Sequence, residues 1–270
     1  MSSVAAKSEL QRAALTQGTH DSRRYVSRLA ARAALYGDLQ ILLDAVREPV
    51  SRAVYRRHVI EENALSRRTV AARKKSWEEL AARYGIDGSL PLFRAFLEEY
   101  RAATSVRDRD LTAYLLFALR DKVVSDLGTE WLYEYLRSAP AELRAVDVLA
   151  FLSSREKTNP EIHGWSAASR ENIASHYLSA LKEFGLARGA QRKIAMRPSP
   201  GAAPLRFLLR AVLMSGASPR TAVESPLFRL LALSLDQTVT LLFQMNADGA
   251  IRCRIQGDVV ELEVGNRRAA

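Results

Sequence analysis

Apolar residues recur every three to four positions along most of the chain, the spacing that buries one face of an amphipathic helix. The pattern predicts helices over residues 25–36, 39–46, 50–60, 66–84, 89–103, 111–126, 129–136, 142–153, 166–184, 205–214, 226–233 and 235–247. Extended chain is predicted at residues 191–197, and a β-hairpin at residues 251–264 that turns at Gly257-Asp258. We therefore expect a mainly α fold: a helical bundle with helix-turn-helix or winged-helix units and short β-hairpin wings.

Polar capping residues and glycines indicate where the predicted helices begin and end. The expected N-terminal caps are Ser66, Ser89, Asp110, Ser166, Ser225 and Ser234. The segment at residues 199–204 has the composition of a linker. We expect a mobile tail at residues 1–24, a helical domain with a helix-turn-helix-like unit at 25–139, a winged-helix-like unit at 140–203, and a C-terminal helical segment with a hairpin at 204–270.

A weak internal repeat is displaced by 100 residues. The first copy opens at Ser66-x-x-Thr69 and closes at Gly85, and the second opens at Ser166 and closes at Gly185. Each copy is typical of a capped helix that stops at a glycine and is followed by extended chain. The second helix of a helix-turn-helix or winged-helix unit has this form.

The charge and cysteine content narrow the functional classes. The chain carries 40 Lys and Arg against 30 Asp and Glu, a formal charge of +10, which favours polyanionic partners. Its single cysteine, Cys253, excludes a disulfide framework and fits a reducing compartment. No apolar run approaches the ~20 residues that span a bilayer, and the first 21 residues lack the apolar core of a signal peptide. We expect a cytoplasmic protein without a membrane partner.

The first repeat helix separates an apolar stripe from a basic face. Val70, Trp77, Ala81 and Tyr84 share the stripe that we expect in the core. Six basic residues face only two acids between positions 66 and 84. The predicted DNA contacts here are Arg67, Arg68, Arg73, Lys74 and Lys75. The alternative is a solvated basic face on an ordinary helix.

The second repeat helix turns a smaller polar face outward. Its buried stripe is predicted to contain Ile173, Tyr177, Leu181 and Phe184. Residues 184–223 then include seven basic residues and no acid. The predicted DNA contacts are Asn172, Ser175 and Lys182 on the helix and Arg188, Arg192, Lys193 and Arg197 on the wing. A protein-docking face, or an acid-free solvated surface, would show the same pattern.

The residues do not form a recognisable catalytic or metal motif. The four histidines are scattered, and none has the spacing of a short zinc motif. Asp108 and Asp110 fit a helix-capping loop better than a carboxylate pair, and Cys253 fits a small core residue. No phosphate-binding loop of the Gly-Lys-Ser/Thr type is present. We expect a non-enzymatic protein with no cofactor and no metal.

Several motifs resemble the BrxA family of the bacterial BREX phage-exclusion systems. They are Glu62-Asn63-Ala64-Leu65-Ser66-x-x-Thr69 with the helix that follows, Trp165-Ser166, Asn172-Ile173-Ala174, and the segment at residues 181–186. The C-terminal helix and hairpin are also similar in order, so the resemblance spans residues 25–264. It implies a small, non-enzymatic, mostly helical protein that binds double-stranded DNA through helix-turn-helix elements, within a module whose other members carry methyltransferase and ATPase activities.

The leading hypothesis is therefore a double-stranded-DNA-binding accessory protein of a BREX-type system. Two alternatives stay open. The chain could be an adaptor that assembles other BREX proteins, or it could be an RNA-binding helical protein.

Overall fold

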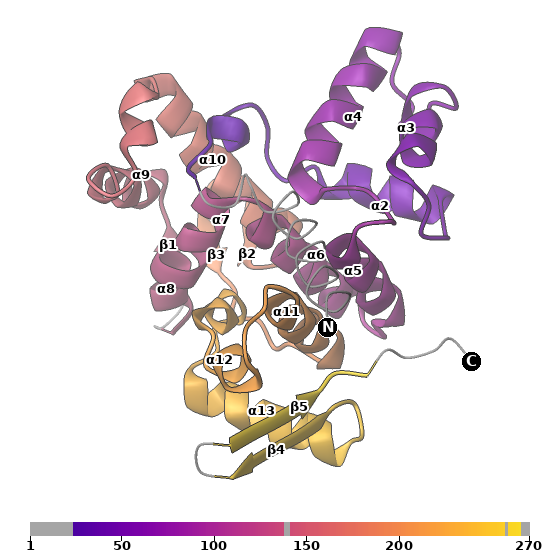
Figure 1. The fold of residues 1–270 in the computed structure, drawn as a ribbon. Coiled ribbons are helices and arrows are strands. Elements are labelled where there is room, and N and C mark those ends of the chain that lie inside the picture. Colours follow the sequence, from indigo (N-terminus) through magenta and orange to yellow (C-terminus); the bar gives the residue numbers. More distant parts are fainter. Residues whose placement is uncertain (1–23, 138–140, 257–258, 266–270) are drawn as a thin grey trace, which may run out of the picture.

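The computed structural model describes residues 24–137, 141–256 and 259–265, and they form a mainly helical protein with a few short antiparallel strands (Figure 1). The first elements are η2 (Ser27–Ala30), α2 (Tyr36–Ala45), α3 (Arg52–Ile60), α4 (Val70–Tyr84), α5 (Pro91–Ala102), α6 (Val106–Arg120), α7 (Lys122–Asp126), the π-helix η3 (Leu127–Leu132) and α8 (Tyr133–Arg137). They are followed by β1 (Glu142–Leu143), α9 (Ala145–Ser154), η4 (Pro160–Gly164), α10 (Ala167–Glu183), β2 (Ala187–Arg188) and β3 (Lys193–Ala195). The last are α11 (Ala202–Met214), α12 (Pro219–Val223), η5 (Pro226–Leu231), α13 (Leu235–Ala247), β4 (Arg252–Gln256) and β5 (Val259–Glu263).

Two small antiparallel sheets accompany the helices. In the first, β3 lies between β1 and β2, with Leu143 opposite Lys193 and Arg188 opposite Ile194. The second is the predicted C-terminal hairpin of β4 and β5. Its turn, predicted at Gly257-Asp258, lies outside the described residues, as do residues 1–23 of the tail predicted at 1–24, and residues 138–140.

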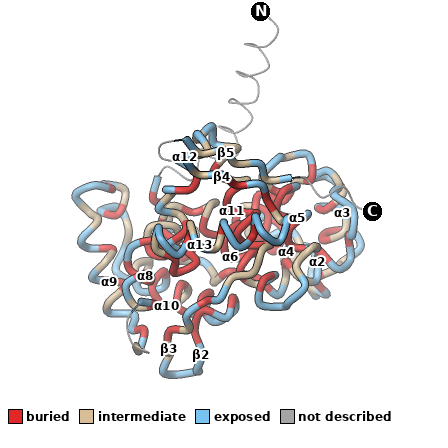
Figure 2. Tube along the Cα trace, turned by 90° about the horizontal axis from the view of Figure 1, so that it is seen from below, coloured by how far each residue is buried: buried red, intermediate tan, exposed pale blue. Residues whose placement is uncertain are grey.

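One hydrophobic core runs through the units predicted at 25–139, 140–203 and 204–270. Phe184, at the end of α10, packs its ring against Tyr36, Tyr114 and Phe117, with ring centroids 5.0, 5.6 and 5.7 Å away. The buried positions gather around α6 and α11 in Figure 2. These units therefore pack on one another around shared aromatic side chains.

The C-terminal segment is attached through a buried ion pair. Arg206 of α11 donates from Nε to Glu99 of α5 at 2.8 Å, and both side chains are almost fully buried. Arg210 also pairs with Glu99, at 3.3 Å. The predicted linker at residues 199–204 is only partly a linker, because α11 begins at Ala202 and the Gly201 N–H donates to Asp108 at 2.8 Å.

The segment at residues 25–36 is not the helix that periodicity predicts. It contains only η2, and the chain then runs irregularly until α2 begins at Tyr36. Its carbonyl groups accept hydrogen bonds from side chains of other elements, and these bonds replace those of a helix. Gly37 and Asp38, which fall between the helices predicted at 25–36 and 39–46, lie inside α2 instead.

Two predicted helix starts are wrong because another residue caps the helix. Helix α4 begins at Val70, where Thr69 accepts from the Ala72 N–H at 3.1 Å, and Ser66 has left-handed φ of 51°. Helix α6 is capped by Ser105, so Asp110 lies inside it and accepts from the Tyr36 hydroxyl at 2.7 Å. The caps at Ser166, Ser225 and Ser234 are confirmed.

Two other boundaries also differ. Leu90, not Ser89, stands at the cap position of α5, since the Ser89 side chain donates to Asp87 instead. The chain at Glu142 pairs with β3 as a strand, and the helix predicted from that residue begins only at Ala145.

Candidate nucleic-acid interface

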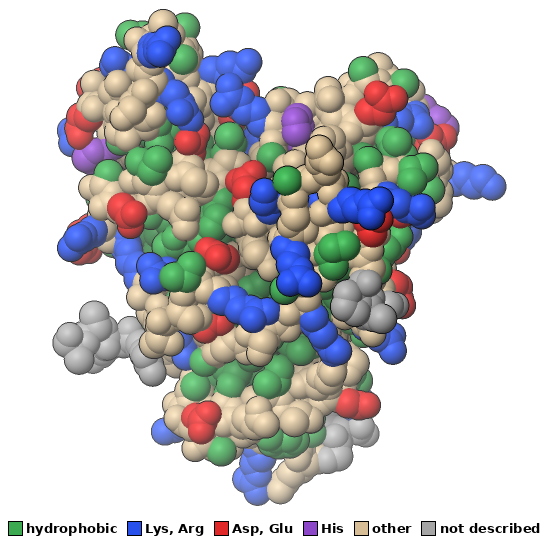
Figure 3. Space-filling model, turned by 180° about the vertical axis from the view of Figure 1, so that it is seen from behind, with side chains coloured by type: hydrophobic (Ala, Val, Ile, Leu, Met, Phe, Trp, Pro, Cys, Tyr) green, Lys and Arg blue, Asp and Glu red, His purple; other side chains and the backbone are tan. Residues whose placement is uncertain are grey.

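The two repeat helices, α4 and α10, lie in separate lobes on the same side of the molecule (Figure 1). Residues 24–35, here called the strap, pass between the two helices. Figure 3 shows the surface hollowed between the two lobes, with Lys and Arg side chains on the rim of the hollow. This arrangement brings the two predicted binding helices to one end of the protein, opposite the β4–β5 hairpin.

Helix α4 buries Trp77, Ala81 and Tyr84, as predicted, but Val70 is 54% exposed in its first turn. Lys74 and Lys75 are exposed on the helix, and Arg68 is exposed just before it. Among the described residues, no acidic side chain pairs with these three cations. They are available to a phosphate backbone.

Arg67 and Arg73, predicted with them, are held by the protein itself. Arg67 pairs with Asp38 of α2 and donates from Nε to the Ser76 hydroxyl at 3.1 Å. Arg73 donates to the carbonyl oxygen of Ile60 at 3.2 Å, which fastens the α3–α4 connection. The structure thus assigns these two arginines to the packing of α4 on its neighbours.

Helix α10 separates its faces as the sequence predicts. Ile173, Tyr177, Leu181 and Phe184 are all buried. The three predicted contacts on the opposite face, Asn172, Ser175 and Lys182, are all exposed. The helix therefore presents two small hydrogen-bonding groups and one cation to solvent.

The β2–β3 hairpin follows α10 directly and adds cations beside it. Arg188 and Arg192 are exposed, and Lys193 is half-buried. The Arg192 Nε lies 4.0 Å from a Glu142 carboxylate oxygen, but its side chain is 85% exposed, so this pair is weak. Arg197 is exposed beyond the strand.

Only part of the acid-free run at residues 184–223 contributes to this surface. Arg206 and Arg210 are buried against Glu99, and Arg220 pairs with Glu224 at 3.0 Å. Acids from elsewhere in the sequence, or just past the run, neutralise these three arginines. Composition over a window could not separate them from the arginines of the hairpin.

The fold brings to the same surfaces further cations that no local sequence pattern indicates. Arg107 of α6 donates to the carbonyl oxygen of Arg197 at 2.8 Å, so it lies beside the basic hairpin. Arg28 and Arg32 belong to the strap, and Arg32 pairs with Glu79 of α4 at 3.2 Å. Because these contacts join residues 47 or more positions apart, no local pattern could have revealed them.

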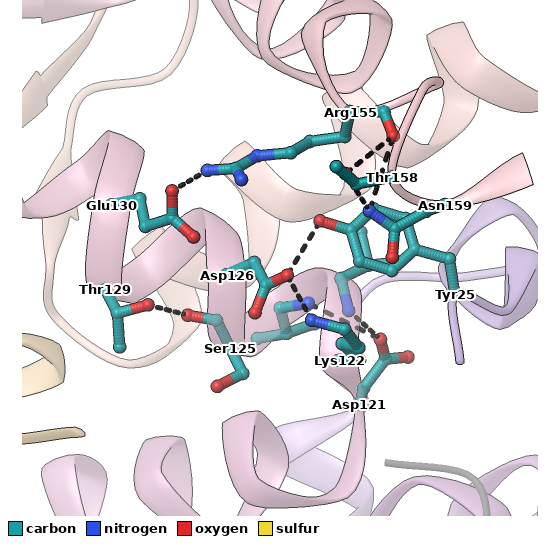
Figure 4. Close-up of polar contacts among 12 residues, drawn as sticks. Tyr25, Asp121, Lys122, Ser125, Asp126, Thr129, Glu130, Arg155, Thr158 and Asn159 are labelled. Carbon is teal, nitrogen blue, oxygen red and sulfur yellow. Dashed lines mark hydrogen bonds and ion pairs between the residues drawn. The ribbon is translucent and has the colours of Figure 1, made fainter. Parts of the chain in front are cut away.

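A polar cluster anchors the N-terminal end of the strap (Figure 4). The Tyr25 hydroxyl donates to Asp126 at 2.9 Å, and the Lys122 ammonium group lies 2.6 Å from the same carboxylate. Nearby, Arg155 pairs with Glu130 of the π-helix. Every charged group drawn here has an internal partner, so we interpret the cluster as structural.

Asp121 sits at the edge of this cluster and caps α7. Its carboxylate accepts from the N–H groups of Val123 and Val124, at 3.0 and 3.4 Å. Burial raises the pKa of Asp121 to about 6, and these hydrogen bonds together with Arg28 and Arg83 oppose the rise.

Within the described ranges, His, Cys, Asp and Glu side chains form no group of three that could hold a metal ion. Cys253 is buried, as predicted. No individual helix in the described part of the chain has both the length and the apolar composition to cross a bilayer. The pair Pro219–Leu231 and Leu235–Ala247 meets those criteria together, but it is bent by 104°.

Fold and surface together define a mainly helical protein that exposes lysines on α4, a small polar face on α10, and a short basic β-sheet after α10. A sequence model of the BrxA family matches residues 23–200, and the chain belongs to that family. This membership implies a role in BREX phage defence. The match ends before α11, so the similarity predicted for residues 201–264 stays a prediction. A search of curated proteins gave no match.

Proposed function

We propose that the protein binds double-stranded DNA, without catalysis, as an accessory component of a BREX system. Helix α10 would enter a groove, and the β2–β3 hairpin would act as a wing on the adjacent phosphates. The element order from α8 through β1, α9, α10, β2 and β3, with β3 central in the sheet, supports a winged-helix unit here.

The observation that carries the proposal is the exposed polar stripe of α10 next to an exposed basic hairpin. Asn172 and Ser175 can bond to base edges or phosphates. Arg188 and Arg192 can neutralise phosphates beside the groove that α10 would enter. Helix α4 adds a second cationic element with Arg68, Lys74 and Lys75. With the formal charge of +10, these faces match a polyanion better than a neutral protein surface.

Fluorescence anisotropy with labelled duplex DNA tests the proposal. Replacing Asn172 and Ser175 with alanine, which alters no charge, is expected to weaken duplex binding by about 10-fold, an effect of about 1.4 kcal/mol. The matched control is Thr240→Ala with Gln244→Ala, which removes two exposed polar groups from α13 and should leave affinity unchanged. Absence of duplex binding by the wild-type protein at low salt would contradict the proposal.

Structured RNA serves as the competitor in the same titration. An A-form major groove is too deep and narrow to admit a reading helix, so RNA should compete poorly with duplex DNA. Equal competition would favour the RNA-binding alternative.

A second candidate function, docking of another BREX component, is favoured by α13. Leu235 and Phe243 are 51% and 46% exposed there, and α13 carries no Lys or Arg. A pocket of about 380 Å³ beside it is lined in part by Val239, Ile255 and Val260. Replacing Leu235 and Phe243 with serine should abolish co-purification with purified BREX components if this surface docks one, and should leave DNA affinity unchanged.

A further inference from the structure

The strap is fastened to both repeat helices by hydrogen bonds to its backbone. From α4, the Arg83 Nε donates to the carbonyl oxygen of Ala33 at 2.8 Å, and the Tyr84 hydroxyl donates to that of Ala34 at 2.9 Å. From α10, the His176 Nδ1 lies 2.8 Å from the carbonyl oxygen of Leu29. A carbonyl only accepts, so Nδ1 carries the proton in this contact.

Each repeat helix also has an exposed residue one turn N-terminal to the residue that contacts the strap. Lys75 stands one turn before Glu79, which pairs with Arg32 of the strap, so Lys75 lies on the strap side of α4. Asn172 likewise stands one turn before His176, on the strap side of α10. Lys75 and Asn172 therefore both lie on the strap side of their helices, and Figure 3 shows the surface hollowed between the two lobes that carry these helices.

The strap also contributes charge to this hollow. Arg32 is 42% exposed although it pairs with Glu79, and Arg28 is half-buried with Nη1 donating to the carbonyl oxygen of Ala82 at 3.4 Å. A polyanion in the hollow would meet Lys75 on one side, Asn172 on the other, and arginines of the strap between them.

We infer that α4 and α10 bind one continuous DNA duplex at a separation set by the strap, with His176 as a positioning residue that ties α10 to it. This inference rests on the proposed DNA binding and adds its substrate: a duplex long enough to reach both helices. The chemical reason is effective concentration, because a duplex held by one helix meets the second without a further loss of translational freedom.

The test compares affinities for duplexes of about 12 and about 24 base pairs, roughly one and two helical turns. The wild-type protein should bind the longer duplex at least about 100-fold more tightly, beyond the small statistical gain from extra sites. His176→Ala should reduce that ratio by about 10-fold while leaving the affinity for the short duplex unchanged. A general loss of stability would lower both affinities together.

Two further variants separate positioning from folding. His176→Asn places an amide N–H near the position of Nδ1 and should restore the wild-type ratio. His58→Ala removes a partly exposed histidine of α3 that pairs with Glu62, away from the strap, and should leave the ratio unchanged.

Each outcome has a distinct meaning. Equal wild-type affinity for both duplex lengths would overturn the inference and leave DNA binding intact. An unchanged ratio in His176→Ala, with the fold verified by its melting transition, would remove His176 from the positioning role. No binding to either duplex would instead overturn the proposed function itself.

Discussion

The Arg83 guanidinium donates from Nε to the carbonyl oxygen of Ala33 at 2.8 Å, joining the last turn of α4 to a strap that lies 50 residues earlier. A second nitrogen, Nη2, donates to the carbonyl oxygens of Arg32 and Arg28. Arg83 is only 2% exposed, and burial lowers its pKa. A buried cation thus occupies the carbonyl groups that a helix at residues 25–36 would have used internally.

Arg83→Met is expected to lower the free energy of unfolding by about 3 kcal/mol, because several buried carbonyl groups would lose their donor. Urea denaturation monitored by circular dichroism measures the change. Arg56→Met, at an exposed position of α3, is the matched control and should change stability by less than about 0.5 kcal/mol. Equal effects of the two substitutions would contradict the role assigned to Arg83.

The buried pair of Glu99 and Arg206 should behave as a unit. Glu99→Leu leaves Arg206 as an unpaired buried charge and is expected to cost about 3–5 kcal/mol of stability. The double variant Glu99→Leu with Arg206→Met removes both charges and should recover most of that loss. A double-mutant cycle by urea denaturation checks this, and additive effects would argue against the coupling.

The raised pKa of Asp121 makes the free energy of unfolding depend on pH, and the contribution of this group falls as the pH rises. Its pKa is raised from 3.8 to about 6 in the folded protein, so the folded state binds more protons than the unfolded state between about pH 4 and pH 6. The contribution of this group to the free energy of unfolding is therefore present below pH 4 and is lost as the pH rises through 6.

Asp121→Asn keeps an oxygen that can accept from Val123 and Val124 but removes the titration. The stability of the wild type relative to this variant should fall by on the order of 2 kcal/mol between pH 4 and pH 7. Denaturation curves at both pH values measure it. A constant or rising difference over this range would contradict the prediction.

The basic residues around α4 should divide into two classes. Arg67→Ala breaks the contacts with Asp38 and Ser76 and should lower stability by about 1 kcal/mol, with little change in DNA affinity. Lys74→Ala with Lys75→Ala should lower DNA affinity with little change in stability, because both side chains are exposed. Thermal melts and anisotropy titrations on the same samples separate the two effects, and a matching profile for both variants would refute the division.

The sequence predicts what depends on local spacing. The buried stripe of α10, its cap at Ser166 and the C-terminal hairpin follow from period and capping residues alone, and all three are confirmed. The strap could not be predicted, because residues 25–36 have helical periodicity and side chains far along the chain, among them Arg83, Tyr84 and His176, hold them in another conformation.

The same limit applies to the surface. An exposed arginine and an internally bonded one look identical in sequence, so the sequence predicts Arg67 and Arg73 as DNA contacts together with Arg68. Distant acids and carbonyl groups decide which class each joins. The exposed face of α10 was predictable because its own helical period determines it.

We expect the β2–β3 hairpin and α10 to hold DNA largely through phosphate contacts. The most direct measurement is the slope of log affinity against log salt concentration for the wild type and for Arg188→Ala/Arg192→Ala/Lys193→Ala. Each lost phosphate contact should reduce the magnitude of the slope by about 0.9. The triple variant, which removes three cations, should therefore reduce it by up to about 2.7. Arg252→Ala with Arg254→Ala, on the opposite hairpin, should leave the slope unchanged. A triple variant with the wild-type slope would show that the β2–β3 hairpin does not bind phosphates.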